Sequence, residues 1–219
     1  MTKYARITAI EYVLPSQTLS NEDLSRDYPE WDVAKIFGKT GINERHIVAA
    51  EETASDLAFS ACEKLLSSVD VPRSSIDFII LCTQSPDYFL PATACILQDR
   101  LGLPTQCGAF DYNQGCSGFI YGLGLAKGLI ESGQANNVVL VTAETYSRYI
   151  NPGDKSVRTL FGDAAAATLI QASDSANGPF LDRFRYGTDG AGAKNLIVPI
   201  GGARCPAELN PAPALRKDE

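Results

Sequence analysis

Apolar and polar side chains alternate over residues 3–13, which predicts a strand with one buried face, and Pro15 ends the alternation. Three later runs are short and mostly apolar, as in strands buried within a sheet: residues 76–82, 107–112 and 137–143. Helical patterns flank these runs at residues 53–67, 91–100 and 117–131. Strands and helices that alternate at these lengths predict an α/β fold, a sheet with helices on its faces.

The segments before and after this central pattern are shorter. Ser20 or Asn21 is expected to cap a short helix, and residues 31–39 are expected to form another helical turn or two. Downstream, residues 164–170 form a small-residue run suited to close packing, and residues 180–187 are predicted to be a strand.

The end of the sequence differs from the rest in composition. After Gly190 it becomes rich in Gly, Pro and Ala, and residues 208–219 contain few core-forming side chains. We therefore expect a domain over residues 1–190 and a loop or tail over residues 191–219.

Composition and charge indicate a globular domain and argue against nucleic-acid and membrane partners. A chain of 219 residues with 45% hydrophobic and 21% charged residues has enough core for one sizeable domain. The net charge of −7 argues against nucleic acid as a partner. Because no apolar run reaches the length of a membrane helix and the N-terminus leads straight into a strand pattern, we expect a cytoplasmic protein without a membrane partner.

The six cysteines do not form a metal-binding or disulfide pattern. There is no C-x-x-C pair and no histidine at ligand spacing, so no metal is expected. Four cysteines lie in apolar helix or strand patterns and are predicted to be small buried hydrophobes: Cys62, Cys82, Cys95 and Cys107.

Cys116 stands apart, because it lies between a strand-like run and a Gly/Ala-rich helical run. A thiolate there would sit at a helix N-terminus, where free N–H groups and the helix dipole stabilise negative charge. Gly115 and Gly118 leave room for a ligand close to the backbone. Two interpretations stay open on these residues alone: a covalent acyl-accepting nucleophile, or a core cysteine at the start of a buried helix.

Several motifs occur in a fixed order along the chain. They are Thr40-Gly41-Ile42-x-Glu44-Arg45-His46, Pro91-Ala92-x-Ala94-Cys95, the segment around Cys116, Phe161-Gly162-Asp163 and Thr188-Asp189-Gly190. With them the chain resembles, from about Ile7 to Ile200, the N-terminal half of the β-ketoacyl-acyl-carrier-protein synthase III family, in the thiolase superfamily. The resemblance implies a thiolase-like α/β fold: a mixed sheet with helices on both faces, forming one half of a five-layer architecture.

The resemblance also implies an acyltransferase of fatty acid or related biosynthesis. In that family the cysteine at the position of Cys116 takes an acyl group from acyl-CoA. The acyl-enzyme then condenses with malonyl carried on acyl carrier protein, and CO₂ leaves. No cofactor is implied beyond acyl-CoA as substrate. The implied partners are acyl carrier protein and either a second copy in a homodimer or a complementary C-terminal half.

The resemblance places part of the catalytic machinery outside this sequence. The family's catalytic His and Asn, and a glycine loop with a second oxyanion amide, belong to the C-terminal half. His46, the only histidine, matches a family histidine outside the catalytic set and is expected to be structural. Two alternatives therefore stay open: a catalytically incomplete piece or scaffolding subunit of such a synthase, or a relative that transfers the acyl group to a non-carbon acceptor.

Four further substrate-binding candidates follow from the resemblance: Leu90, Trp31, Lys155 and Phe161. Leu90 matches a position that lines the acyl pocket across a dimer interface; the alternative is an ordinary core leucine. Trp31 resembles a tryptophan that stacks on the CoA adenine, although its spacing to Thr40 is longer than usual; the alternative is helix packing. Lys155 falls where the family often has an arginine near the nucleotide; the alternative is a surface lysine.

Other residues argue against competing functions. Related hydroxymethylglutaryl-CoA synthases have a glutamate base in the segment where this chain has Gln84, and an amide cannot take up and hold a proton at neutral pH. Gly122, Gly124 and Gly128 fall inside a predicted helix, which indicates close helix packing and not a dinucleotide loop. Asp163 is predicted to be a structural turn residue.

Overall fold

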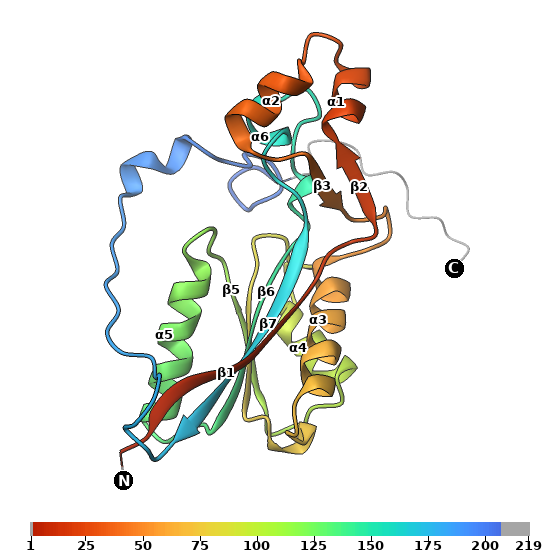
Figure 1. Cartoon of the computed structure of the whole chain (residues 1–219). Coiled ribbons are helices and arrows are strands. Elements are labelled where there is room, and N and C mark those ends of the chain that lie inside the picture. Colours follow the sequence, from red (N-terminus) through yellow and green to blue (C-terminus); the bar gives the residue numbers. More distant parts are fainter. Residues whose placement is uncertain (1, 207–219) are drawn as a thin grey trace, which may run out of the picture. The chain divides into compact units, whose positions relative to one another are not determined.

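The computed structural model describes residues 2–206, and its centre is a five-stranded sheet with the strand order β1-β7-β6-β4-β5 (Figure 1). β4 (Phe78–Cys82) pairs in parallel with β5 (Gly108–Tyr112) on one side and with β6 (Asn137–Glu144) on the other. β7 (Ala164–Ser173) runs antiparallel to both β6 and β1 (Tyr4–Val13). The sheet is therefore mixed, as predicted.

Helices cover both faces of this sheet (Figure 1). Ile79 and Leu81 of β4 pack in one apolar core with α3 (Ala54–Ser68) and α4 (Thr93–Arg100). Ile80 points to the opposite face, because side chains alternate along a strand, and packs in a second core with α5 (Gly118–Glu131). The predicted α/β architecture is confirmed.

Local capping signals place the helices close to their predicted positions. Thr53 precedes α3 and forms a reciprocal capping box with Asp56, and Ser20 does the same for α1 (Asn21–Asp27). α4 begins at Thr93, two residues after Pro91, so that predicted boundary was slightly early.

A smaller cluster of elements surrounds a second, two-stranded sheet. β2 (Gln17–Ser20) pairs antiparallel with β3 (Glu44–Ile47). α1 and α2 (Val33–Thr40) pack together through Leu24, Trp31 and Ile36. The short helix α6 (Lys155–Arg158) approaches the same cluster, since Lys155 Nζ lies 5.6 Å from the centre of the Trp31 ring.

Two predictions about single segments were wrong. Residues 180–187 form no strand; instead, the Leu181 amide donates one hydrogen bond to the Ala5 carbonyl (2.8 Å) without starting a ladder. Cys95 is exposed on α4, whereas Cys62, Cys82 and Cys107 are buried as predicted. Cys95 lies on an apolar-looking stretch, but only its neighbours Ala94 and Leu97 face the core.

The helix glycines differ from one another in their surroundings. A Cβ on Gly122 would lie 2.4 Å from Tyr112 Oη and 2.5 Å from Leu140 Cδ1, so α5 approaches the sheet as closely as predicted. A Cβ on Gly128 would meet nothing within 4 Å, so the prediction of close packing was wrong there.

The chain divides into two compact units, and the boundary lies between Phe184 and Arg185. In the described part of the second unit, Asp189 caps a short 3-10 turn (Gly190–Lys194) by accepting from the Ala191 amide at 3.0 Å. The loop predicted for residues 208–219 lies outside the described residues.

Candidate active site

The parallel strands β4, β5 and β6 end at the same edge of the sheet (Figure 1). Cys82, the last residue of β4, is in register with Tyr112 of β5 and Thr142 of β6. The segments that follow the three strands therefore gather at one edge. In open α/β sheets this carboxyl edge is where ligands bind.

Cys116 lies on the turn that joins β5 to α5, and its side chain is exposed. The turn is closed by the Gly118 amide, which donates to the Gly115 carbonyl at 2.7 Å. Ser117 occupies the N-cap position of α5, but its side chain makes no capping hydrogen bond, in contrast to Ser20 of α1. The interpretation of Cys116 as a buried core cysteine is therefore wrong.

A second cysteine, Cys82, contacts the same turn. Cys82 donates from Sγ to the Gln114 carbonyl (3.2 Å), and a Cβ on Gly118 would lie only 2.3 Å from that sulfur. The Tyr112 hydroxyl donates to the Gly118 carbonyl at 2.7 Å. Burial raises the pKa of the Cys82 thiol, so it is suited to packing and not to nucleophilic attack.

The segment after β4 lies against the same turn. Gln84 donates from Nε2 to Asn113 Oδ1 (3.2 Å), and its Oε1 is 3.1 Å from where a Cβ on Gly115 would be. Its backbone amide donates to the Glu144 carboxylate at 2.7 Å. Sequence reasoning missed Glu144, although a carboxylate at the end of an apolar strand is a recognisable signal.

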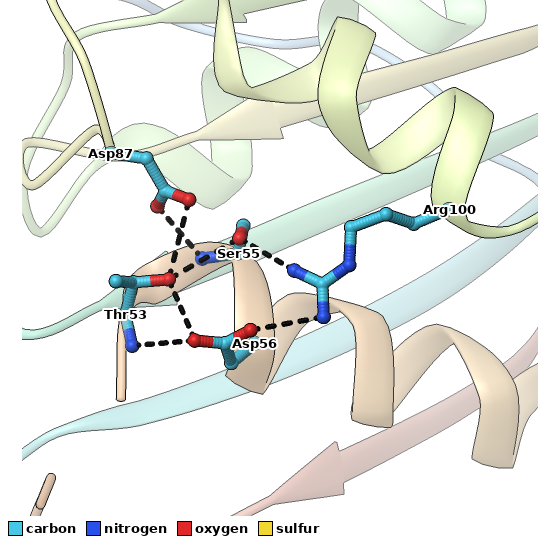
Figure 2. Close-up of polar contacts among 5 residues, drawn as sticks. All are labelled: Thr53, Ser55, Asp56, Asp87 and Arg100. Atoms are coloured by element: carbon cyan, nitrogen blue, oxygen red, sulfur yellow. Dashed lines mark hydrogen bonds and ion pairs between the residues drawn. The ribbon is translucent and has the colours of Figure 1, made fainter. Parts of the chain in front are cut away.

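The middle of the β4–α4 loop is held by a polar network (Figure 2). Asp87 accepts from the Ser55 amide (3.1 Å), and its other oxygen is 3.2 Å from the Thr53 hydroxyl. Arg100 of α4 donates to the Ser55 hydroxyl (2.7 Å) and is 2.9 Å from Asp56. The N-terminus of α3 and the loop are thereby tied together, a contact that no local sequence signal predicted.

This anchored loop presents three apolar side chains to the outside. Tyr88, Phe89 and Leu90 are 62%, 85% and 82% exposed. The interpretation of Leu90 as an ordinary core leucine is therefore wrong. A run of three exposed apolar residues is typical of a surface that contacts another molecule.

Two of the predicted substrate-binding residues, Trp31 and Lys155, lie together in the smaller cluster. Trp31 is only 4% exposed, and Tyr28 stacks on its ring with a centroid distance of 4.3 Å. Lys155 is exposed and holds its ammonium group over the Trp31 ring. Phe161 packs against Tyr146, with ring centroids 5.0 Å apart. Trp31 is therefore part of the helix packing, and Lys155 is the accessible member of the pair.

His46 and Asp163 both make specific contacts with the backbone. His46 Nδ1 is 2.6 Å from the Pro15 carbonyl, so the ring is held in the smaller sheet. Asp163 is buried and accepts from the amides of Val48 (2.9 Å) and Ser147 (2.8 Å). These contacts are those of a residue that fixes turns, as predicted for Asp163.

Metal binding and membrane insertion can both be assessed for residues 2–206. No group of three or more His, Cys, Asp and Glu side chains is placed to hold a metal ion there. Over the same residues, every helix is too short or too polar to span a bilayer.

Known proteins match this chain over most of its length. Residues 110–190 match the family model described as 3-Oxoacyl-[acyl-carrier-protein (ACP)] synthase III. The chain is 42% identical over 201 residues, 90% of its own length, to a beta-ketoacyl-[acyl-carrier-protein] synthase III of Xanthomonas euvesicatoria pv. vesicatoria (strain 85-10). It is 38% identical over 214 residues, 96% of its length, to a synthase III 3 of Streptomyces coelicolor.

Solved structures of synthases with related names are also similar to this chain. A 2.1 Å crystal structure of a 3-oxoacyl-(acyl-carrier-protein) synthase III superimposes with a TM-score of 0.87 at 54% identity, covering 93% of this chain and 60% of that one. The priming beta-ketosynthase of the R1128 polyketide pathway superimposes with a TM-score of 0.74 at 27% identity. The chain spans about 60% of the length of the relatives it matches, 59% of the Xanthomonas protein and 62% of the Streptomyces protein.

Proposed function

Because this chain is related to the β-ketoacyl-acyl-carrier-protein synthase III family over the part that it spans, we propose that it performs the acyl-loading step of such a synthase. The observation that carries this proposal is Cys116, an exposed thiol on the turn that opens α5, in a segment where the chain matches the family. An exposed thiol at the head of a long helix is suited to accept an acyl group.

The loading step follows from this geometry. The Cys116 thiolate attacks the thioester carbonyl of acyl-CoA, the carbon–sulfur bond to CoA breaks, and CoA leaves as a thiolate that takes up a proton. The products are acyl-Cys116 and free CoA. The backbone amide of Cys116 and the positive end of the α5 dipole would stabilise the oxyanion of the tetrahedral intermediate.

The condensation step needs a further half. By the family resemblance, a histidine and an asparagine from that half would assist decarboxylation of malonyl carried on acyl carrier protein. His46 is the only histidine in this sequence, and its contact with Pro15 holds it in the smaller sheet. We therefore propose that condensation, in the cytoplasm and with acyl carrier protein as partner, requires such a half beside this chain.

A partner surface accompanies this proposal. Ile120 and Leu125 are large apolar side chains that α5 exposes, and Tyr88, Phe89 and Leu90 project from the β4–α4 loop. We propose that a complementary half covers α5 and that a second copy meets the loop, where Leu90 would line an acyl pocket. We propose that Lys155, which lies over the Trp31 ring, meets a phosphate of CoA, and that Phe161 contributes to substrate binding.

Intact-mass measurement after incubation with a panel of acyl-CoAs tests the loading step. We expect one acyl adduct, which Cys116→Ala removes and Cys95→Ala, an exposed-cysteine control, leaves in place. An adduct that survives Cys116→Ala would contradict the assignment. No adduct with any donor would favour the second candidate, a scaffolding or incomplete subunit, which the partial span of about 60% already keeps open.

A further inference from the structure

Glu144, the last residue of β6, is a partly buried carboxylate that the loading step does not use. Its Oε1 accepts from the Gln84 amide at 2.7 Å and its Oε2 from the Ser85 hydroxyl at 2.8 Å. Both oxygens therefore bind the segment that follows β4. The two segments are 60 residues apart in the sequence, so this contact exists only in the folded chain.

Ser85 completes the connection between the two strand ends. It is buried, and its hydroxyl oxygen accepts from the Thr145 amide at 2.8 Å while the hydroxyl donates to Glu144. Its own amide donates to Thr83 Oγ at 3.0 Å. Both carboxylate oxygens of Glu144 and the hydroxyl of Ser85 are hydrogen-bonded in this small network, which defines its geometry.

Gln84 connects this network to the turn that contains Cys116. Its backbone is fixed by Glu144, while its side chain reaches the other way and donates to Asn113 Oδ1. Its Oε1 lies so close to Gly115 that a Cβ there would be only 3.1 Å away. The side chain therefore rests on the backbone of the turn, directly before Cys116.

The pKa of Glu144 is raised by burial and by the nearby charge of Asp163, and the hydrogen bonds from Ser85 and Gln84 only partly offset this. The two groups that donate to it are a neutral amide and a neutral hydroxyl. A buried carboxylate with a raised pKa is typical of functional sites, and this one binds the residue that contacts the turn of Cys116.

We propose that Glu144 is a positioning residue for Cys116 that acts through Gln84 and fixes the turn at residues 113–116 for acyl transfer. The expected effect on acyl transfer rests on the proposed loading function, whereas the hydrogen-bonded connection from Glu144 to the turn does not. A shift of about 1 Å in a reacting group can cost on the order of a hundredfold in rate, so a remote anchor of this kind can control acyl transfer.

The geometry is tested first by hydrogen exchange at the Gly118 amide, which donates to Gly115 and closes the turn. In Glu144→Gln and in Gln84→Ala we expect this amide to exchange on the order of tenfold faster. Glu131→Gln, which changes a glutamate on α5 paired with Lys127, is the matched control and leaves the exchange rate unchanged. Faster exchange confined to residues 83–85 and 144–145 would overturn the proposal.

The consequence is tested by comparing two reactions at Cys116, each followed on the peptide that contains it. Acyl transfer from acyl-CoA should slow about 10- to 100-fold in Glu144→Gln and in Gln84→Ala. Alkylation by iodoacetamide, which needs no oxyanion site, should change less than about threefold. Since the two residues act in series, the double variant should be no slower than the slower single variant.

Equal slowing of both reactions, or additive effects in the double variant, would overturn the positioning role. Gln84→Ala changes an exposed side chain, so it decides the question even if Glu144→Gln impairs folding. If the unsubstituted protein accepts no acyl group, the loading function fails, and the exchange rate of the Gly118 amide still decides the inference.

Discussion

The loop between β4 and α4 is held at two places by carboxylates, but the networks around them differ. At the start of the loop, Glu144 binds Gln84 and Ser85 through neutral donors. At its middle, Asp87 also accepts from neutral donors, Ser55 and Thr53, but these belong to a network in which Arg100 pairs with Asp56 (Figure 2). The Asp87 network therefore contains a cation, whereas both donors to Glu144 are neutral.

The pKa of Glu144 and that of Asp56, the carboxylate of the second network that pairs with Arg100, are shifted in opposite directions. Burial raises the pKa of Glu144. Burial also acts to raise the pKa of Asp56, but hydrogen bonds from Thr53 and the nearby Arg100 outweigh it, and the net pKa of Asp56 is lowered. The Asp87 network leads into the exposed apolar side chains, whereas Gln84, which Glu144 binds, lies against the turn of Cys116. The carboxylate with the raised pKa therefore holds the segment where the chemistry is proposed.

Among substitutions near Cys116, the largest effect on stability should come from Gly118→Ala. Its new Cβ would lie 2.3 Å from Cys82 Sγ, so α5 or β4 must shift, and we expect about 2–3 kcal/mol of lost stability in urea unfolding. Cys82→Ala in the same chain should recover part of the loss by removing the sulfur.

Gly128→Ala is the matched control for that substitution. It adds the same methyl group to the same helix where nothing lies within 4 Å, and it should stabilise the protein by about 0.5–1 kcal/mol. Equal effects of the two alanines would contradict the close contact between the turn and β4.

In the second network, Asp87→Ala should cost about 1–2 kcal/mol in urea unfolding, because it removes an acceptor from the Ser55 amide at the start of α3. Asp70→Ala, at an exposed aspartate after α3, should change stability by less than about 0.5 kcal/mol. A loss at Asp87 no greater than at Asp70 would show that the network does not anchor the loop.

The contributions of Asp56 and Glu144 to stability should respond to pH with opposite signs. Asp56 has a lowered pKa, so its contribution is present above the ordinary aspartate pKa of about 3.9 and is lost as the pH falls through the folded value. Glu144 has a raised pKa, so its contribution is present below the ordinary glutamate pKa of about 4.3 and is lost as the pH rises through the folded value.

Urea midpoints from pH 3 to 7 measure this difference. The stability advantage of the unsubstituted protein over Asp56→Asn should grow as the pH rises, and its advantage over Glu144→Gln should shrink. Slopes of the same sign would remove the contrast between Asp56 and Glu144.

The smallest effect should come from the ion pair itself. Arg100→Met keeps an unbranched apolar stem, so mainly the 2.9 Å contact with Asp56 and the hydrogen bond to Ser55 are lost. Because these side chains are partly exposed, we expect less than about 1 kcal/mol, reduced further in 1 M salt. A loss that salt does not reduce would point to packing on Phe59, which the guanidinium covers at 4.8 Å, as its source.

Features that depend on neighbouring residues were determined by the sequence. The alternation over residues 3–13 and the apolar runs of β4, β5 and β6 predicted strands that the structure contains, because side-chain periodicity reports directly on local backbone geometry. The turn of Cys116 and the caps at Ser20 and Thr53 follow from a few adjacent residues in the same way.

Exposure and long-range pairing were decided only by the tertiary structure. Cys95 and Leu90 lie in apolar stretches yet are exposed, because packing of neighbouring elements determines which side of a short segment is covered. The contact of Glu144 with Gln84 joins two strand ends, and the contact of Asp87 with Ser55 joins a loop to a helix. Neighbouring residues predict neither pairing, since each joins segments that are far apart in the sequence and meet only in the folded chain.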